Sequence, residues 1–220
     1  MLGPDGQQEL LRRLAEAAAR RGLLVAPVGS VFFLHRGRRS LLTKDLDAVV
    51  TTLDGEPVSL AELEAIARDL GPATTASDEA TVTVAIPGLA EAEVDLLRGK
   101  EGAKRGFLPR GLLREAAQRG TVEGSILWYP VEYVVVLKAD AAVDRAQRAE
   151  KGGAFAEANL ARARDFRNDV VAQVDEALER GALRPAYLAD AVRHLKAKRR
   201  ADVVRLLEFA AAGRFALEGL

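Results

Sequence analysis

Residues 28–50 read VGSVFFLHRGRRSLLTKDLDAVV, and this stretch decides the fold that we expect. An apolar strand over residues 23–28 ends at Gly29-Ser30, and a short helix begins over residues 31–35. A second strand follows over residues 45–52. Because a helix and a basic turn separate the two strands, they do not form a simple hairpin, and the order predicts a mixed α/β domain.

The second strand carries two carboxylates, Asp45 and Asp47, on either side of Leu46. Side chains alternate between the faces of a strand, so both carboxylates are expected on one face. At about 5 Å and an effective dielectric constant near 20, they would repel each other by roughly 3 kcal/mol. A divalent cation between them converts this repulsion into attraction, so the pair predicts a metal site. The alternative is a solvated strand face.

Gly29-Ser30 lies at the expected turn from strand to helix. A glycine lets the backbone approach a ligand, and the first turn of a helix offers N–H groups to a phosphate. A phosphate cradle beside a carboxylate pair supplies the parts needed for phosphoryl or nucleotidyl transfer. The alternative is an ordinary turn followed by a serine N-cap.

The composition limits the chemistry open to the chain. Its 220 residues include 32 basic and 32 acidic side chains, no cysteine, and two histidines, His35 and His194. The lack of cysteine excludes cysteine-ligated zinc, iron–sulfur clusters and thiol nucleophiles, so a metal needs oxygen ligands, which favours Mg²⁺ or Mn²⁺. We see no signal peptide and no long apolar run, and we therefore expect a cytoplasmic protein with no membrane partner.

The hydrophobic pattern divides the chain into two parts. In the first part, the pattern predicts helices over residues 5–21, 59–70 and 110–119, with a Ser59/Glu62 capping box at the start of the second helix. It also predicts a hairpin over residues 80–86 and 92–97. In the second part, it predicts helices over residues 131–150, 154–180, from Pro185 onward, and over 198–212. We therefore expect an α/β domain over residues 1–125 and an all-helical domain over residues 126–220.

These motifs resemble the nucleotidyltransferase superfamily with the polymerase-beta-like fold. In that pattern a Gly-Ser or Gly-Gly precedes an Asp-x-Asp, and a third carboxylate lies on a later strand. Gly29-Ser30, Asp45-Leu46-Asp47 and Asp95 are similar to it, although the interval between Ser30 and Asp45 is slightly longer.

The sequence is most similar to the AbiEii-like branch, which includes toxins of toxin–antitoxin pairs. That branch has a downstream Lys-Ala pair on a helix, and then a basic-Asp pair with a further Asp. Lys138-Ala139 and Arg164-Asp165 with Asp169 are similar to these.

The resemblance implies a metal-dependent transfer of a nucleoside monophosphate from an NTP. The acceptor would be RNA (tRNA included), a protein side chain or a small molecule, and a cognate antitoxin would be a protein partner. Asp45, Asp47 and Asp95 would hold Mg²⁺, and Asp95 would also help to deprotonate the acceptor hydroxyl. Gly29 and Ser30 would bind the β- and γ-phosphates, Lys138 would pair with the triphosphate, and Asp165 would orient Lys138 or the acceptor.

Two groups of basic side chains flank the expected site: Arg36, Arg38 and Arg39 before the metal strand, and Lys100, Lys104 and Arg105 after Asp95. We expect them to form a positive rim for a triphosphate, with Arg39 among its contacts, or for an RNA backbone. Basic stretches are usually solvated faces, which is the alternative.

The remaining candidates also have structural interpretations. Glu93 shares a strand face with Asp95, and Lys138 lies mid-helix, where a lysine stem often packs on apolar neighbours. Asp165 and Asp169 are spaced as in a surface ion network. Two further functions therefore stay open: a nucleotide-, RNA- or protein-binding module without turnover, and a helical interaction protein whose α/β half is a scaffold.

Overall fold

The structure is a computed structural model that describes residues 4–29, 32, 45–70, 74–77, 81–85, 93–100 and 108–217. The chain forms two compact units, Met1–Tyr129 and Pro130–Leu220. The first is mixed α/β and the second is helical throughout its described residues, which confirms the expected fold class at this level. No helix in the described part of the chain is both long and apolar enough to cross a membrane.

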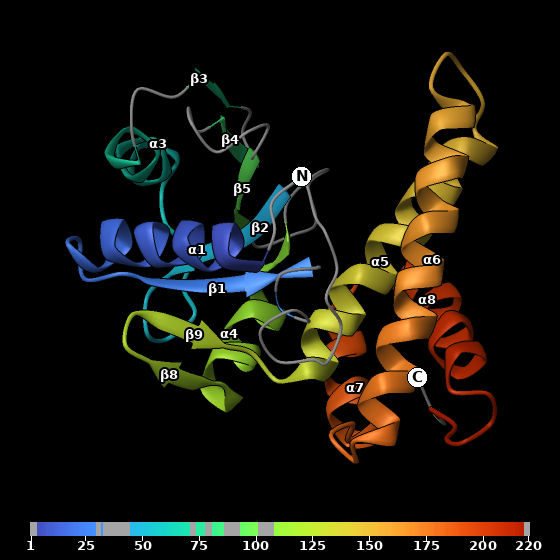
Figure 1. Cartoon of the computed structure of the whole chain (residues 1–220). Helices are drawn as coiled ribbons and strands as arrows, with labels where there is room; N and C mark the ends of the chain where they lie inside the picture. The colour runs from blue at the N-terminus through green and yellow to red at the C-terminus, as the bar shows by residue number, and fades with distance from the viewer. Residues whose placement is uncertain are drawn as a thin grey trace. The chain divides into compact units, whose positions relative to one another are not determined.

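The first unit contains twelve described elements, in the chain order α1 (Pro4–Ala19), β1 (Leu24–Val28), β2 (Asp45–Thr51), α3 (Leu60–Asp69), β3 (Thr74–Ser77), β4 (Thr81–Ala85), β5 (Glu93–Leu97), β6 (Gly99–Lys100), β7 (Leu108–Pro109), α4 (Arg110–Arg119), β8 (Thr121–Glu123) and β9 (Ile126–Trp128) (Figure 1).

Seven of the described strands form one mixed sheet in the order β3-β4-β5-β2-β1-β9-β8. The pairs β2–β5 and β1–β9 are parallel, and the other neighbours are antiparallel. The hairpin expected over residues 80–86 and 92–97 is confirmed as β4 and β5. Its second strand also pairs with β2, and this brings two distant acidic motifs onto adjacent strands.

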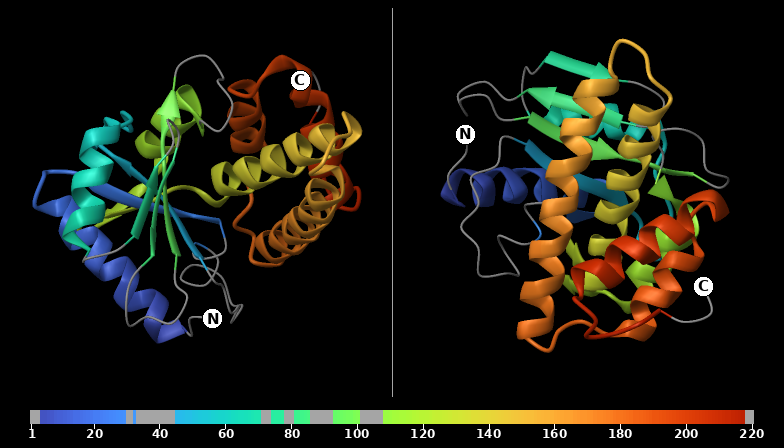
Figure 2. Two further views of the ribbon diagram at one scale, coloured as in Figure 1. Left: turned by 90° about the horizontal axis from the view of Figure 1, so that it is seen from above. Right: turned by 90° about the vertical axis from the view of Figure 1, so that its right-hand side faces the viewer.

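The two faces of the sheet differ in polarity. Helices α1 and α3 lie together against one face (Figure 2, left), where Leu46, Val84 and Leu96 are fully buried. Side chains alternate along a strand, so Asp47 and Asp95 lie on the opposite face. The apolar residues therefore fix which way the acidic residues point.

A local capping signal marks the start of α3, whereas a long-range strand pairing moves the domain boundary. The predicted capping box is confirmed: the Glu62 N–H donates to Ser59 Oγ at 3.2 Å, and the Ser59 N–H donates to Glu62 Oε2 at 2.8 Å. The hairpin β8–β9 was not predicted. Because β9 pairs with β1, residues 126–129 join the first unit, four residues beyond the expected boundary. The short helix expected over residues 31–35 lies outside the described residues except for Phe32.

The second unit consists of α5 (Val131–Glu150), α6 (Ala156–Glu179), α7 (Pro185–Arg193) and α8 (Ala197–Ala210) (Figure 1), as the sequence predicts. Helix α5 packs against each of the other three. At its start, fully buried Glu132 accepts hydrogen bonds from the Arg184 backbone N–H at 2.7 Å and from Arg184 Nε at 3.0 Å. This carboxylate ties the beginning of α5 to the segment before α7.

A second buried ionic contact joins α5 to α8. Arg199 Nε lies 3.0 Å from Asp140 Oδ1, and Arg199 Nη1 lies 3.2 Å from Asp144 Oδ1. Burial raises the pKa of Asp140 to about 6, against the opposing influence of the Arg199 charge, while the Asp144 charge raises it further and Lys196 lowers it. Desolvation therefore outweighs the ion pair at this carboxyl.

Candidate functional site

The centre of the candidate site is a pair of carboxylates on neighbouring parallel strands. Asp47 of β2 and Asp95 of β5 are register partners, and both side chains are partly buried. Neighbouring strands lie about 4.8 Å apart, and register partners point to the same face of the sheet. The structure thus brings together two of the three expected metal ligands, which are far apart in the sequence.

The third expected ligand is Asp45, two positions earlier on β2. Its register partner on β5 is Glu93, the acidic residue that the sequence offered as a competitor of Asp95. Glu93 is thus aligned with Asp45, and Asp95 with Asp47. The side chains of Asp45 and Glu93 lie outside the described part of the structure, as do Ser30, Arg39, Lys104 and Arg105.

Thr83 of β4 orients the Asp95 carboxylate. The Thr83 hydroxyl donates to Asp95 Oδ1 at 2.6 Å, and the two residues are register partners across β4 and β5. A hydroxyl on an adjacent strand fixes the rotamer of the carboxylate, which is how supporting groups position metal-binding acids. Sequence reasoning missed Thr83, although the alternation of Thr81, Val82, Thr83 and Val84 placed its hydroxyl on the polar face.

The backbone at Gly29 lies close to the Asp47 carboxylate. It follows β1 directly, its φ is +67°, and a Cβ built on it would lie 2.6 Å from Asp47 Oδ2. Both the dihedral and the contact disfavour any side chain at this position. At this strand end there is therefore room for backbone only next to Asp47.

These residues form a donor set suited to a hard cation. Carboxylate oxygens are the ligands that Mg²⁺ and Mn²⁺ prefer, and Asp47 and Asp95 supply two carboxylates on one face. Among the described residues, no group of three or more Asp, Glu, His or Cys side chains gathers to form a fuller metal site. The described pair fits part of a magnesium site, to which Asp45 would add.

Two of the expected helical motif residues, Lys138 and Asp169, are in contact within the second unit. Lys138 Nζ lies 2.8 Å from Asp169 Oδ2 and 4.4 Å from the centre of the Phe166 ring, and its side chain is only 11% exposed. The partner of Lys138 is thus Asp169, whereas Asp165 is exposed on α6. A lysine held by one carboxylate over an aromatic ring has a fixed position and a partly shielded charge.

No protein family matches the chain, and no curated protein does. Among solved structures, the chain is similar to the protein of the "Crystal structure of JHP933 from Helicobacter pylori", at 11% sequence identity over 96% of each chain, with a TM-score of 0.37.

Proposed function

We propose that this chain is a metal-dependent nucleotidyltransferase with a polymerase-beta-like fold, which moves a nucleoside monophosphate from an NTP to an acceptor hydroxyl. The observation that supports this most is the registration of Asp47 against Asp95, with Gly29 in contact range of Asp47. A carboxylate pair beside a tight glycine is the combination that binds a cation and a phosphate together.

Each residue of the site has a role in the proposed reaction. Asp45, Asp47 and Asp95 would hold Mg²⁺, which would supply neutralisation of the triphosphate charge and a lower pKa of the attacking hydroxyl. Thr83 keeps Asp95 Oδ1 in place, which leaves Oδ2 to take the acceptor proton. Gly29 and Ser30 receive the β- and γ-phosphates through the backbone and the serine hydroxyl.

Lys138 and Arg39 complete the proposed nucleotide contacts. By the family resemblance, Lys138 would pair with the triphosphate in place of its contact with Asp169, and Asp165 would orient Lys138 or the acceptor. Replacing Lys138 by methionine keeps the packing on Phe166 but removes the charge, so it should weaken NTP affinity at least tenfold. An Asp54→Asn variant should leave NTP affinity unchanged.

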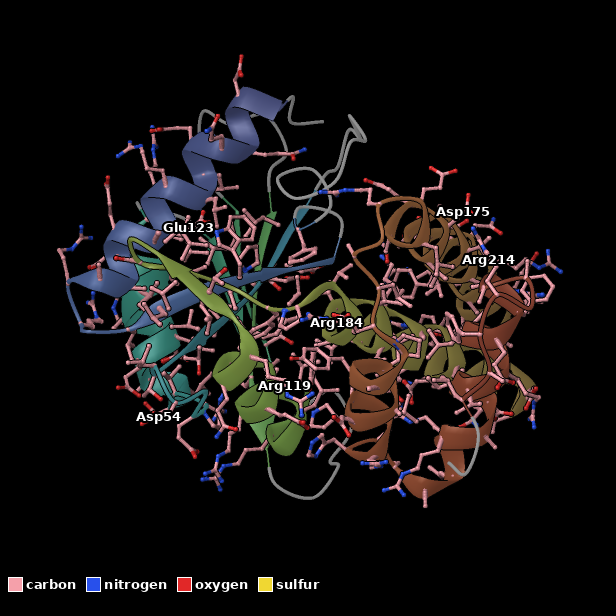
Figure 3. All side chains as sticks on the ribbon, turned by 90° about the horizontal axis from the view of Figure 1, so that it is seen from below. Asp54, Arg119, Glu123, Asp175, Arg184 and Arg214 are labelled. Atoms are coloured by element: carbon pink, nitrogen blue, oxygen red, sulfur yellow. The ribbon has the colours of Figure 1, made fainter. Side chains whose placement is uncertain are left out.

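The test uses purified protein with Mg²⁺, each of the four α-labelled NTPs and total RNA. The variants are Asp47→Asn and Asp95→Asn, and the matched control is Asp54→Asn, an exposed acid at the outer edge of the first unit (Figure 3). We expect label transfer and pyrophosphate release from the parent and from the control, and a loss of at least a hundredfold from the two site variants. Mn²⁺ binding by calorimetry gives a second readout, in which only the site variants lose affinity.

Two outcomes would contradict the proposal. Equal labelling by the parent and by Asp47→Asn would show that the carboxylates take no part in the reaction. Nucleotide binding without metal that survives Asp47→Asn, with no transfer to RNA, protein or small-molecule acceptors, would favour a binding module on the same fold. Whether an antitoxin binds, and whether the chain is a toxin, is tested separately by growth on induction with and without a neighbouring small reading frame.

A further inference from the structure

The helical unit contains an apolar pocket that the proposed reaction does not use. Its volume is about 500 Å³, and its walls come from α5, α6 and α8. This volume falls within the range typical of small-molecule sites. The floor is made of short side chains, namely Ala142, Val143 and Ala146 of α5 and Ala163 of α6.

Large apolar side chains at the pocket are unusually exposed. Leu160 and Phe209 line it and are 42% and 59% exposed, and Leu206 joins them. Helices α5, α6 and α8 pack well elsewhere, because Val203 and Leu207 of α8 are fully buried. Exposed leucine and phenylalanine around one cavity indicate a place where an apolar group is received.

The charged side chains that line the pocket are all basic. Three arginines line it, Arg164, Arg167 and Arg205, and its described lining contains no acidic residue. Among the described residues Arg164 has no ion-pair partner, and the Arg167 guanidinium lies 4.6 Å from the centre of the Phe209 ring. Arg205 pairs with Asp202, which lies outside the pocket lining. An anionic group therefore finds partners here, and a cationic one does not.

The pocket is also distinct from the Lys138 contact on the same helix α6. Its α6 residues Leu160, Ala163, Arg164 and Arg167 follow the spacing of a single helix face. Asp169, the partner of Lys138, does not line the pocket and belongs to another face of α6.

We propose that this pocket binds a small amphipathic anion, a molecule with a medium-length acyl or aryl part and a carboxylate, sulfonate or phosphate head. The apolar part lies on the alanine floor against Leu160 and Phe209. The head group lies between Arg164 and Arg167. A docked protein helix fits less well, because ten residues line the pocket, whereas a protein interface takes roughly 20–30 residues a side.

The test measures binding of decanoate to the full chain by calorimetry below its micelle concentration, with decanol as the neutral ligand of equal chain length. We expect decanoate to bind at least tenfold more tightly than decanol. The double variant Arg164→Gln/Arg167→Gln should remove that preference. The matched control changes two exposed cations outside the pocket, Arg162→Gln/Lys198→Gln, and should keep it.

A second pair of variants tests the cavity itself. Ala146→Leu fills the floor and should weaken decanoate binding at least tenfold, whereas Ala172→Leu lies on α6 away from the pocket lining and should not. Circular dichroism of each variant shows that the helices are intact. No binding of decanoate at 1 mM, equal affinity for decanol, or no effect of Ala146→Leu would overturn the proposal. Tighter binding of an 18-residue amphipathic Leu/Glu peptide than of decanoate would overturn it in favour of a partner helix.

Discussion

Asp47 and Asp95 are register partners on the parallel strands β2 and β5, and each has a different neighbour on its outer side. The backbone of Gly29 lies against Asp47, and the Thr83 hydroxyl donates to Asp95. The strands β4, β5 and β2, together with the residue that follows β1, therefore each contribute one member of the site. The arrangement allows the two supports to be tested one at a time.

Gly29→Ala should destabilise the first unit more than a dihedral penalty explains. The positive φ alone costs about 1–2 kcal/mol for alanine, and the contact of a Cβ with Asp47 adds to it. Gly22→Ala is the matched control, because its φ is +68° and nothing lies within 4 Å of the added Cβ. Urea unfolding should show a larger loss for Gly29→Ala by about 1 kcal/mol or more, together with weaker Mn²⁺ binding. Equal losses would show that the contact with Asp47 has no energetic weight.

Thr83→Val keeps the shape of the side chain but removes the hydrogen-bond donor to Asp95. A hydrogen bond to a charged group is worth about 1.5–3 kcal/mol, and the partial exposure of this one puts the expected loss near 1–2 kcal/mol. Mn²⁺ affinity should fall because the carboxylate gains rotamers. Thr121→Val on the exposed strand β8 serves as the control. Unchanged stability and unchanged Mn²⁺ affinity of the Thr83→Val variant would show that Thr83 does not support the site.

Lys138 and Asp169 should be coupled energetically. A double-mutant cycle with Lys138→Met and Asp169→Asn, followed by urea unfolding, should give a coupling of about 0.5–1 kcal/mol, because Asp169 is partly exposed and solvent screens the pair. A parallel cycle of Lys138→Met with Asp165→Asn should give none. Coupling to Asp165 in place of Asp169 would contradict the observed contact.

Asp140 should lower the stability of the chain as the pH rises, despite its contact with Arg199. Its ordinary pKa of 3.8 is raised to about 6 in the fold, so the folded state binds more protons than the unfolded state between these values. The contribution of Asp140 to the free energy of unfolding therefore falls by about 3 kcal/mol as the pH increases from below 3.8 to above 6.

The Asp140→Asn variant isolates this effect, because it cannot titrate. Relative to the parent, it should gain stability as the pH rises from 4 to 7, measured by urea unfolding at each pH. A variant that instead loses stability relative to the parent over that interval would show that the ion pair with Arg199 outweighs burial.

Local patterns in the sequence were sufficient for most elements. The alternation around Asp45 and Asp47 predicted β2, and the Ser59/Glu62 pair predicted the start of α3, because both depend on neighbours along the chain. The very short strands β8 and β9 carry too few residues to show a period. Pro130 marked the start of α5 correctly, but the sequence did not show that the preceding hairpin pairs with β1.

The contacts within the site depend on strand register, which the sequence does not display. That Thr83 meets Asp95, and that Gly29 meets Asp47, follows only once β4, β5, β2 and β1 are aligned. Similarly, the choice of Asp169 over Asp165 as the partner of Lys138 depends on how α5 and α6 are rotated against each other. Residue types were predictable, whereas pairings between distant segments were not.

The position of β5 between β2 and β4 has a consequence for how the protein is made. A ribosome that has completed β2 and β4 has not yet released the strand that must insert between them. The nascent chain therefore contains Asp47 without Asp95 until residues beyond Leu97 have emerged. The paired carboxylates arise only after β5 has been synthesised, so a truncated product ending before β5 lacks the pair altogether.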